Sequence, residues 1–267
     1  MLNFEDHVAF ITGGGTGIGL ACASEIIAGG GRVVLAGRRE DVLKEAAATL
    51  GERATYVVCD VNDDASVEQA VAQVIAQQGS LSLAVNAAGM GMAGSVLGTS
   101  VELFQMVMET NLTGCFRAMQ AEARAMRAAG KGGSIVNISS IAGALTHRWM
   151  TAYCVSKAGV NMLTQCAADD LGEFGIRVNA VMPGIVDTEL AGPLVDSEHA
   201  QREYKSLMPI SRVGEPADIG KMVAFLLSEE SSWITGQVIG VDGGHTIRKG
   251  PDLRPLFRGL LPDEPEE

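Results

Sequence analysis

The stretch HVAFITGGGTGIGLACASEIIA, residues 7–28, decides the fold of this chain. Its first six residues are mostly apolar and β-branched, which predicts a buried strand, and residues 18–28 have the pattern of a helix that ends at three glycines. Glycines in the turn between them let backbone N–H groups approach a pyrophosphate, and the N-terminus of the following helix adds a partial positive charge. We therefore predict a dinucleotide-phosphate site at Gly13, Thr16, Gly17, Ile18 and Gly19.

The alternation of strand and helix continues along the chain. Short β-branched runs predict further strands at residues 32–36, 54–59, 81–86, 134–138, 176–181 and 237–241. Amphipathic segments predict helices at residues 40–50, 64–78, about 100–130, 152–174 and 217–227. A capping box at Thr99 and Glu102 marks the start of the third of these helices. Strands that are apolar on both faces indicate an α/β fold, a Rossmann-like, doubly wound parallel sheet of seven strands with helices on both faces.

Composition and charge narrow the function classes. The 267 residues are 47% apolar and 19% charged, which excludes a disordered chain. A formal net charge of −12 without a basic block argues against nucleic acid or an anionic membrane as partner. The N-terminal residues lack the pattern of a signal peptide, and five cysteines without a Cys-x-x-Cys pair indicate a reducing, cytoplasmic setting with no metal site.

The domain organisation is predicted to be simple. No linker with a shift in composition divides the chain, so we expect one nucleotide-binding catalytic domain at residues 1–246, with a substrate-lid segment at residues 189–212. Residues 247–267 contain four prolines and end in acidic residues, which predicts a C-terminal arm outside the core.

The end of the second predicted strand indicates which dinucleotide binds. An NAD site usually places an acid there to hold the ribose diol, but the chain has Gly37 followed by Arg38 and Arg39. A guanidinium group is a natural partner for a 2′-phosphate, so we predict NADP(H) in preference to NAD(H). The alternative is that both arginines belong to a solvated helix start and pair with Glu40 or Asp41.

Two further strand ends are candidates for cofactor contact. Asp60 and Val61 follow the third predicted strand, where a short acid can accept from an adenine amino group or cap the next helix. The segment Asn86-Ala87-Ala88-Gly89 ends the fourth, and its small residues let a ribose lie against the strand. We predict that Asp60, Val61, Asn86, Ala87 and Gly89 contact the cofactor.

A tyrosine and a lysine lie four residues apart at the start of the predicted helix 152–174. Residues spaced in this way share one helix face, so the Tyr153 phenol and the Lys157 ammonium converge on one site. A phenol has an ordinary pKa of about 10. Because a nearby ammonium and an oxidised nicotinamide both favour the phenolate, we expect Tyr153 to act as an acid or base near neutral pH.

Together these motifs resemble the short-chain dehydrogenase/reductase family in its single-domain form, from about residue 7 to residue 244. The resemblance rests on the glycine string, Asn86-Ala87-Ala88-Gly89, Asn111, Ser140, Tyr153, Lys157, Pro183-Gly184, Thr188 and Val241-Asp242-Gly243-Gly244.

The resemblance implies a role for each matching residue. Tyr153 would be the general acid/base, and Lys157 would bind the nicotinamide ribose and lower the pKa of the tyrosine. Ser140 would hydrogen-bond the reacting oxygen, while the neighbouring Ser139 would be structural. Asn111 would hold a water in the proton relay. The segment that would hold the nicotinamide carboxamide comprises Pro183, Gly184, Val186 and Thr188. The resemblance also implies that the protein forms a homodimer or homotetramer.

The substrate-facing segments of this family are rich in methionine and leucine in this chain. Methionine adapts to irregular apolar shapes, so we expect a small lipophilic ketone or secondary alcohol, such as a ketoacyl chain, a steroid or another cyclic carbonyl. The predicted pocket residues are Met90, Met92, Leu145, Trp149, Met150 and Leu190. His147, in the loop before Tyr153, is interpreted as a rim or solvated residue.

Two alternative functions stay open. One is an enoyl-thioester reductase of the same family, since the Gly37-Arg38 pair and residues 233–237 (WITGQ) resemble such enzymes. Dienoyl reductases usually depart from the Ser–Tyr pattern, which this chain keeps. The other is a catalytically idle NADP-binding regulator, which the intact set of Asn111, Ser140, Tyr153 and Lys157 argues against.

Overall fold

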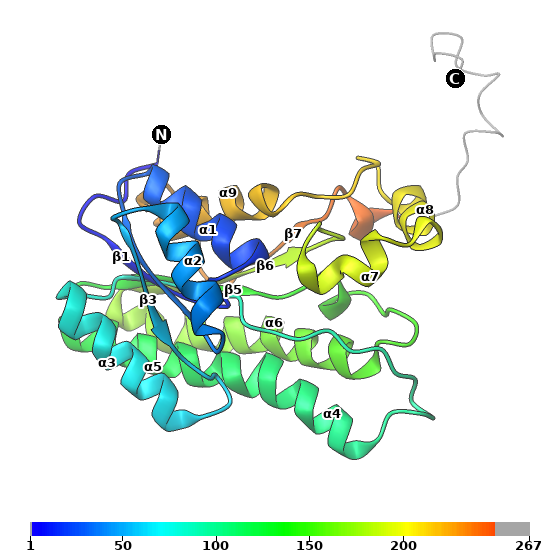
Figure 1. Cartoon of the computed structure of the whole chain (residues 1–267), viewed down its shortest axis with the longest axis horizontal. Coiled ribbons are helices and arrows are strands. Elements are labelled where there is room, and N and C mark those ends of the chain that lie inside the picture. Colours follow the sequence, from blue (N-terminus) through cyan, green and yellow to red (C-terminus); the bar gives the residue numbers. More distant parts are fainter. Residues whose placement is uncertain (1, 249–267) are drawn as a thin grey trace, which may run out of the picture.

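The computed structural model describes residues 2–248; most of the predicted C-terminal arm lies outside the described residues. Seven parallel strands form one sheet in the order β3-β2-β1-β4-β5-β6-β7 (Figure 1), which confirms the predicted fold class. The strands are β1 (Val8–Thr12), β2 (Arg32–Gly37), β3 (Ala54–Val58), β4 (Leu83–Asn86), β5 (Gly133–Ile138), β6 (Ile176–Pro183) and β7 (Val238–Val241).

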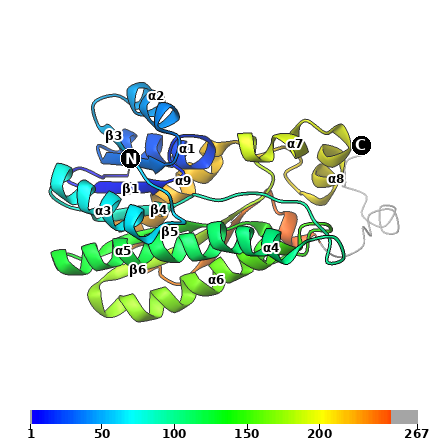
Figure 2. The same cartoon turned by 60° about the horizontal axis from the view of Figure 1, so that its bottom comes forward.

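Helices cover both faces of the sheet. The α-helices are α1 (Gly17–Ala28), α2 (Glu40–Leu50), α3 (Asp64–Gln78), α4 (Val101–Met108), α5 (Gly114–Ala129), α6 (Thr151–Leu171), α7 (Gly192–Val195), α8 (Glu198–Leu207) and α9 (Pro216–Leu227). One face packs against α1, α2 and α9, and the other against α3, α5 and α6 (Figures 1 and 2). No helix in residues 2–248 is long and apolar enough to cross a membrane.

Strand β1 shows why the sheet is covered on both sides. Its five residues are all buried, and they alternate between two cores. Ala9 and Ile11 join the core under α1, α2 and α9, whereas Val8 and Phe10 join the core under α3, α5 and α6. Because successive side chains of a strand point to opposite faces, an apolar run of this kind requires helices on both.

The sheet order reverses at β1, which pairs with β2 on one side and with β4 on the other. The connection that leaves β1 leads to β2, whereas the connection that leaves β4 leads to β5 on the other side, so a crevice opens between β1 and β4 at the carboxyl ends of the strands. Ligands of open α/β sheets bind at this point.

Two details of the sequence prediction need correction. The helix expected at about residues 100–130 is divided, because a π-helical segment (Glu109–Thr113) separates α4 from α5. The N-cap of α4 is Ser100, whose side chain accepts a hydrogen bond from the backbone N–H of Leu103. The hydroxyl of Thr99, which belongs to the predicted capping box, instead donates to the Ser95 carbonyl. The short helices α7 and α8 of the lid segment were not predicted.

Candidate active site

A cleft of about 720 Å³ opens at the carboxyl ends of the strands. The segments that follow β1 to β6 all contribute to its wall, and the lid segment after β6 closes one side. The wall includes these predicted cofactor residues: Gly13, Thr16, Gly17, Ile18, Gly19, Arg38, Arg39, Asp60, Val61, Ala87, Gly89, Tyr153, Lys157, Pro183, Gly184, Val186 and Thr188. The predicted residue Asn86 is outside this set.

The glycine string has the geometry that a phosphate cradle requires. Gly13 has a φ of +65°, and a Cβ at this position would lie 2.8 Å from the carbonyl carbon of Ala87. A side chain is therefore excluded both by the backbone conformation and by space. The string leads into the N-terminus of α1, whose free N–H groups favour an anion. These features fit the pyrophosphate of a dinucleotide.

The two arginines at the end of β2 have different surroundings. Both line the cleft. The guanidinium of Arg39 makes two 3.2 Å bonds to the Glu189 carboxylate, which belongs to the lid segment. Its partner is thus neither of the neighbouring acids considered from the sequence. Arg38 forms no ion pair with any residue of the described chain. The structure therefore leaves Arg38 available to an anion and links Arg39 to the lid.

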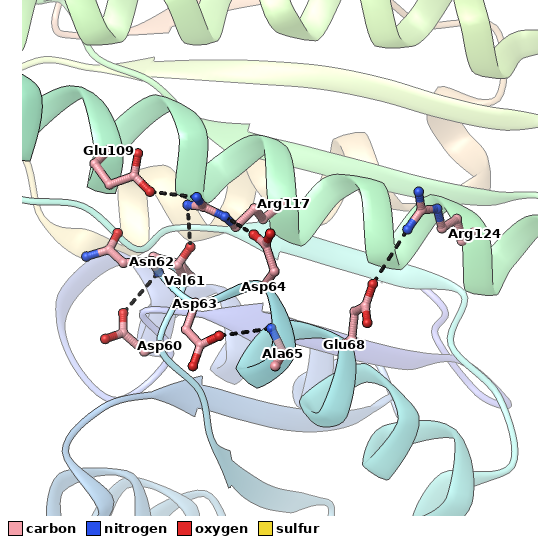
Figure 3. Close-up of polar contacts among 10 residues, drawn as sticks. All are labelled: Asp60, Val61, Asn62, Asp63, Asp64, Ala65, Glu68, Glu109, Arg117 and Arg124. Carbon is pink, nitrogen blue, oxygen red and sulfur yellow. Dashed lines mark hydrogen bonds and ion pairs between the residues drawn. The ribbon is translucent and has the colours of Figure 1, made fainter.

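The turn after β3 is held by a residue that the sequence did not single out (Figure 3). Arg117 of α5 pairs with Asp64 and with Glu109 and donates to the Val61 carbonyl at 3.3 Å. Within the turn, Asp60 Oδ1 accepts a hydrogen bond from the backbone N–H of Asn62 at 3.0 Å. Arg117 therefore positions the segment in which we expect the adenine to bind.

The predicted catalytic side chains Ser140, Tyr153 and Lys157 meet at the centre of the cleft. The Ser140 hydroxyl interacts with Tyr153 and acts to lower the pKa of its hydroxyl. The Lys157 ammonium donates to the Ile138 carbonyl at 2.8 Å and lies 5.8 Å from the centre of the Tyr153 ring. Ser139 turns away and donates to the Lys157 carbonyl at 3.1 Å. The structure thus places Ser140, and not Ser139, beside the tyrosine.

The pKa directions of the two acid–base groups follow from their burial. Burial raises the pKa of Tyr153, and its interaction with Ser140 offsets only part of that rise. The lowering of this pKa by the Lys157 ammonium together with an oxidised nicotinamide stays a prediction. Burial also lowers the pKa of Lys157 to about 8, so its ammonium form still predominates at pH 7. Tyr153 is consequently a protonated phenol at neutral pH, the form needed in an acid.

Asn111 lies in the π-helical segment and is buried outside the cleft wall. Its amide pairs with both backbone groups of Met90, accepting from N at 2.8 Å and donating to O at 3.0 Å. Nδ2 also donates to the Ser156 hydroxyl at 3.1 Å. The side chain thus fixes the segment after β4. A π-bulge frees backbone groups and is frequent at functional sites, so any contact with a water would come from the backbone.

Asn86 lies behind the cleft wall and is buried. Its Nδ2 donates to Glu122 Oε2 at 3.0 Å and to Asn137 Oδ1 at 3.1 Å. Glu122 of α5 is completely buried, and its Oε1 has no hydrogen-bond partner among residues 2–248. Burial raises the pKa of Glu122 to about 8. Asn86 therefore supports the end of β4 from behind, which corrects its predicted direct contact with the cofactor.

The predicted substrate pocket is assembled in part. Met90, Met150 and Leu190 line the cleft, together with Leu194 and Tyr204 from the lid. Met92, Leu145 and Trp149 lie outside its wall, and Trp149 is 63% exposed. Within residues 2–248, no cluster of His, Cys, Asp and Glu could hold a metal ion.

Sequence reasoning missed Arg117, Glu122 and Tyr204. For Glu122 a signal existed, because it shares a helical face with Ala118 and Met126, both apolar and buried. Arg117 and Tyr204 carried no comparable signal. Asp64, which pairs with Arg117, and His147, which stacks on Tyr204, come from distant parts of the chain.

The fold, the cleft and the Ser140–Tyr153–Lys157 arrangement define the class of protein, and the comparisons agree. A family model described as enoyl-(acyl carrier protein) reductase matches residues 13–246. A structure of a short-chain type dehydrogenase/reductase from Mycobacterium ulcerans aligns with a TM-score of 0.90 and 37% identity, covering 97% of this chain and 96% of that one. The chain belongs to the short-chain dehydrogenase/reductase family, whose members are oxidoreductases that use nicotinamide cofactors.

Relatives with assigned activities act on alcohols. The 2,5-dichloro-2,5-cyclohexadiene-1,4-diol dehydrogenase of Sphingobium indicum is 36% identical over 248 residues, which is 92% of this chain and 99% of that protein. The galactitol 2-dehydrogenase of Cereibacter sphaeroides is 36% identical over 250 residues, covering 92% and 98%. The NADP-dependent (R)-specific alcohol dehydrogenase of Lentilactobacillus kefiri is 35% identical over 248 residues, covering 91% and 98%.

Proposed function

We propose that this protein is an NADP(H)-dependent oxidoreductase that transfers a hydride between nicotinamide and a lipophilic ketone or secondary alcohol. The observation that carries the proposal is that Ser140, Tyr153 and Lys157 lie together in the wall of a cleft that fits a dinucleotide, with the Lys157 ammonium 5.8 Å from the centre of the Tyr153 ring. Relatives that oxidise secondary alcohols support the reaction type.

The residues of the cleft carry out the proton transfer that accompanies hydride transfer. A bound nicotinamide supplies the hydride for reduction or accepts it in oxidation. Ser140 and Tyr153 hold the substrate oxygen between them, and Tyr153 donates its proton to that oxygen as the carbonyl carbon is reduced. The buried ammonium of Lys157 favours the phenolate that remains. In the direction of oxidation the same phenolate accepts the proton.

The two arginines at the end of β2 support the preference for NADP(H). Replacing both Arg38 and Arg39 with alanine is expected to raise the Kd for NADPH by roughly 10- to 100-fold, because hydrogen bonds to charged groups contribute about 1.5–3 kcal/mol. The Kd for NADH should change by less than threefold. Isothermal titration calorimetry with both nucleotides measures the effect without turnover.

A matched variant tests the role of the Arg39–Glu189 pair. Replacing Glu189 with glutamine frees the Arg39 guanidinium without moving the lid backbone, so NADPH should bind more tightly than to wild type. Equal weakening of NADPH and NADH in the double arginine variant would contradict a 2′-phosphate site.

A substrate screen tests the proposed reaction itself. Purified protein is mixed with NADPH or NADH and a panel of cyclic ketones, ketoacyl thioesters and small sugars, and cofactor oxidation is followed by absorbance. We expect turnover of cyclic or acyl ketones with NADPH. Activity confined to small polar sugars would overturn the lipophilic assignment, and absence of turnover with every carbonyl would overturn the reaction.

An enoyl-thioester reductase is the second candidate, because the matching family model carries that description. The presence of both Ser140 and Tyr153 in the cleft wall favours carbonyl reduction, since their hydroxyls can both donate to one substrate oxygen. Adding a trans-2-enoyl thioester to the screen separates the two reactions. Reduction of the enoyl thioester faster than that of any ketone would favour the second candidate.

A further inference from the structure

Three segments that are distant in sequence bring aromatic rings together at the substrate end of the cleft. The His147 ring stacks against Tyr204 of α8, with 6.2 Å between ring centres and 30° between planes. His245, at the C-terminal end of the described chain, meets Tyr204 edge-on at 5.5 Å. His147 and Tyr204 both line the cleft that contains Tyr153. We call these two residues the His147–Tyr204 pair.

The hydrogen-bonding role of His147 is set by its surroundings. Nδ1 lies 3.2 Å from the Leu145 carbonyl oxygen. A carbonyl only accepts, so the neutral ring carries its proton on Nδ1 and leaves Nε2 as an acceptor. No residue of the described chain bonds to Nε2. The backbone of His147 is also held, since its amide donates to Cys154 Sγ at 3.4 Å, one residue from the catalytic tyrosine.

The turn after His147 is strained in a way that points to function. Trp149 has a φ of +69°, a conformation that non-glycine residues rarely adopt. It is held because the Trp149 carbonyl accepts from Gly94 N at 2.6 Å and the Met150 amide donates to the His147 carbonyl at 3.1 Å. Strained residues of this kind cluster at ligand sites. The turn exposes Trp149 and leaves His147 in the cleft wall.

Tyr204 completes the pair as a donor. Burial raises the pKa of Tyr204, so its hydroxyl is protonated at neutral pH. That hydroxyl has no hydrogen-bond partner within residues 2–248, and the phenol is close enough to Tyr153 to raise its pKa. His245 is buried behind Tyr204, and burial keeps its imidazole neutral by lowering its pKa. His245 is therefore a positioning residue for the Tyr204 ring.

The geometry points to a second hydroxyl group on the substrate, which donates to Nε2 of His147 and accepts from the Tyr204 hydroxyl. This inference rests on the proposed function and deepens it: the substrate is a hydroxyketone, or the corresponding diol, with an apolar body against Met90, Met150 and Leu190. A hydroxyl suits the pair because it donates and accepts at once.

The same pair selects against a wholly apolar substrate. A methyl group in place of the hydroxyl would leave Nε2 of His147 and the Tyr204 hydroxyl without a hydrogen-bond partner on the substrate. Burying an unsatisfied polar group costs about 1–3 kcal/mol. Sites built to bond a substrate hydroxyl reject analogues that lack it much more strongly than apolar pockets reject a change in size. We therefore expect discrimination of at least about tenfold.

Matched substrates test the inference. The probes are 2-, 3- and 4-hydroxycyclohexanone and the methylcyclohexanones with the same substitution, since a methyl group has nearly the size of a hydroxyl. Wild-type protein with NADPH should reduce at least one hydroxyketone with kcat/KM ten or more times that of its methyl counterpart.

Variants assign the preference to the pair. Tyr204→Phe and His147→Phe should each reduce the hydroxyl advantage to less than threefold, mainly by raising KM for the hydroxyketone. His147→Gln retains an acceptor and should keep part of the advantage. Tyr56→Phe is the matched control, since Tyr56 lies outside the cleft wall, and should behave as wild type.

A binding measurement separates this inference from the proposed function. The Tyr153→Phe variant is saturated with oxidised NADP and titrated by calorimetry with cyclohexanediols and methylcyclohexanols; the preferred diol should bind at least ten times more tightly than its methyl counterpart. Equal use and equal binding of the two series, or an advantage that survives in both ring variants, would overturn the inference. If no ketone is reduced in a Tyr153-dependent way, the proposed function fails, and the diol titration still decides the role of the pair.

Discussion

Replacing Tyr153 with phenylalanine is expected to lower kcat by about 1,000-fold or more at pH 7. The variant keeps the ring in the cleft wall but removes the hydroxyl that donates a proton to the substrate oxygen in the proposed reaction. Proton transfer by a positioned side chain contributes about 100- to 10,000-fold to a rate, and here the hydroxyl also binds the reacting oxygen. Steady-state NADPH oxidation with the best ketone of the screen measures the loss.

Binding and folding controls make this result specific. The Kd of Tyr153→Phe for NADPH should stay within threefold of wild type, because the phosphates and ribose are held by other residues of the cleft. The Tyr56→Phe variant should retain full activity. A Tyr153→Phe protein that keeps more than a tenth of wild-type kcat would falsify the role of this tyrosine as the acid. Loss of NADPH binding together with activity would show a structural role instead.

The second large effect concerns stability. Replacing Glu122 with glutamine is expected to remove a pH dependence of about 2–3 kcal/mol from the free energy of unfolding between pH 5.5 and pH 8, at 1.36 kcal/mol per pKa unit. The unfolded chain ionises this carboxyl near its ordinary pKa of 4.5, whereas the folded protein keeps the proton until about pH 8. The unfolded state therefore binds fewer protons in this range, and wild-type stability falls as pH rises.

The glutamine variant preserves the local geometry. Its side-chain oxygen can still accept from Asn86 Nδ2, as Glu122 Oε2 does at 3.0 Å. Urea unfolding is followed by circular dichroism at one protein concentration and several pH values. The free energy of unfolding of the variant should increase relative to that of the wild type as the pH rises to 8. The exposed Glu230→Gln serves as control and should parallel wild type. Parallel curves for Glu122→Gln and wild type would show that Glu122 does not hold its proton in the folded state.

The buried carboxyl connects stability to the site. Glu122 lies under Asn86 at the end of β4, and the next residues, Ala87 and Gly89, line the cofactor cleft. Ionisation of Glu122 places a charge beneath that wall without a second hydrogen-bond partner for its Oε1 among the described residues. If the wild type binds the cofactor more weakly above pH 8 and Glu122→Gln does not, the ionisation of Glu122 would be the cause of that loss of affinity.

Much of the site was predictable because its motifs are local. The turn between β1 and α1 depends on residues within one strand end and one helix start, and the glycines required there are adjacent in sequence. The pairing of Tyr153 with Lys157 follows from the helix repeat alone. Alternation at a strand end predicts that only one of Ser139 and Ser140 faces the site, and the family resemblance, not local geometry, selected Ser140.

The lid and the substrate end were less predictable. Met92, Leu145 and Trp149 looked like pocket residues from their chemistry, but the left-handed turn at Trp149 exposes this side chain and leaves His147 in the wall. A single positive φ angle at a tryptophan has no sequence signal. The helix α8 that supplies Tyr204 has an exposed, charged sequence, which gives little indication that one of its residues enters a cleft.

The sequence by itself predicted the parallel sheet, the phosphate turn and the Tyr153–Lys157 pair, because each depends on hydrophobic periodicity or on residues a few positions apart. Only the tertiary structure decided which distant side chains meet: Glu189 with Arg39, Glu122 under Asn86, and Tyr204 beside His147. These contacts arise where the order of strands in the sheet reverses, between β1 and β4, and where the lid segment borders the cleft. The free energies of these contacts depend on burial and desolvation. Both are set by all the residues packed around a contact and not by its neighbours in the sequence.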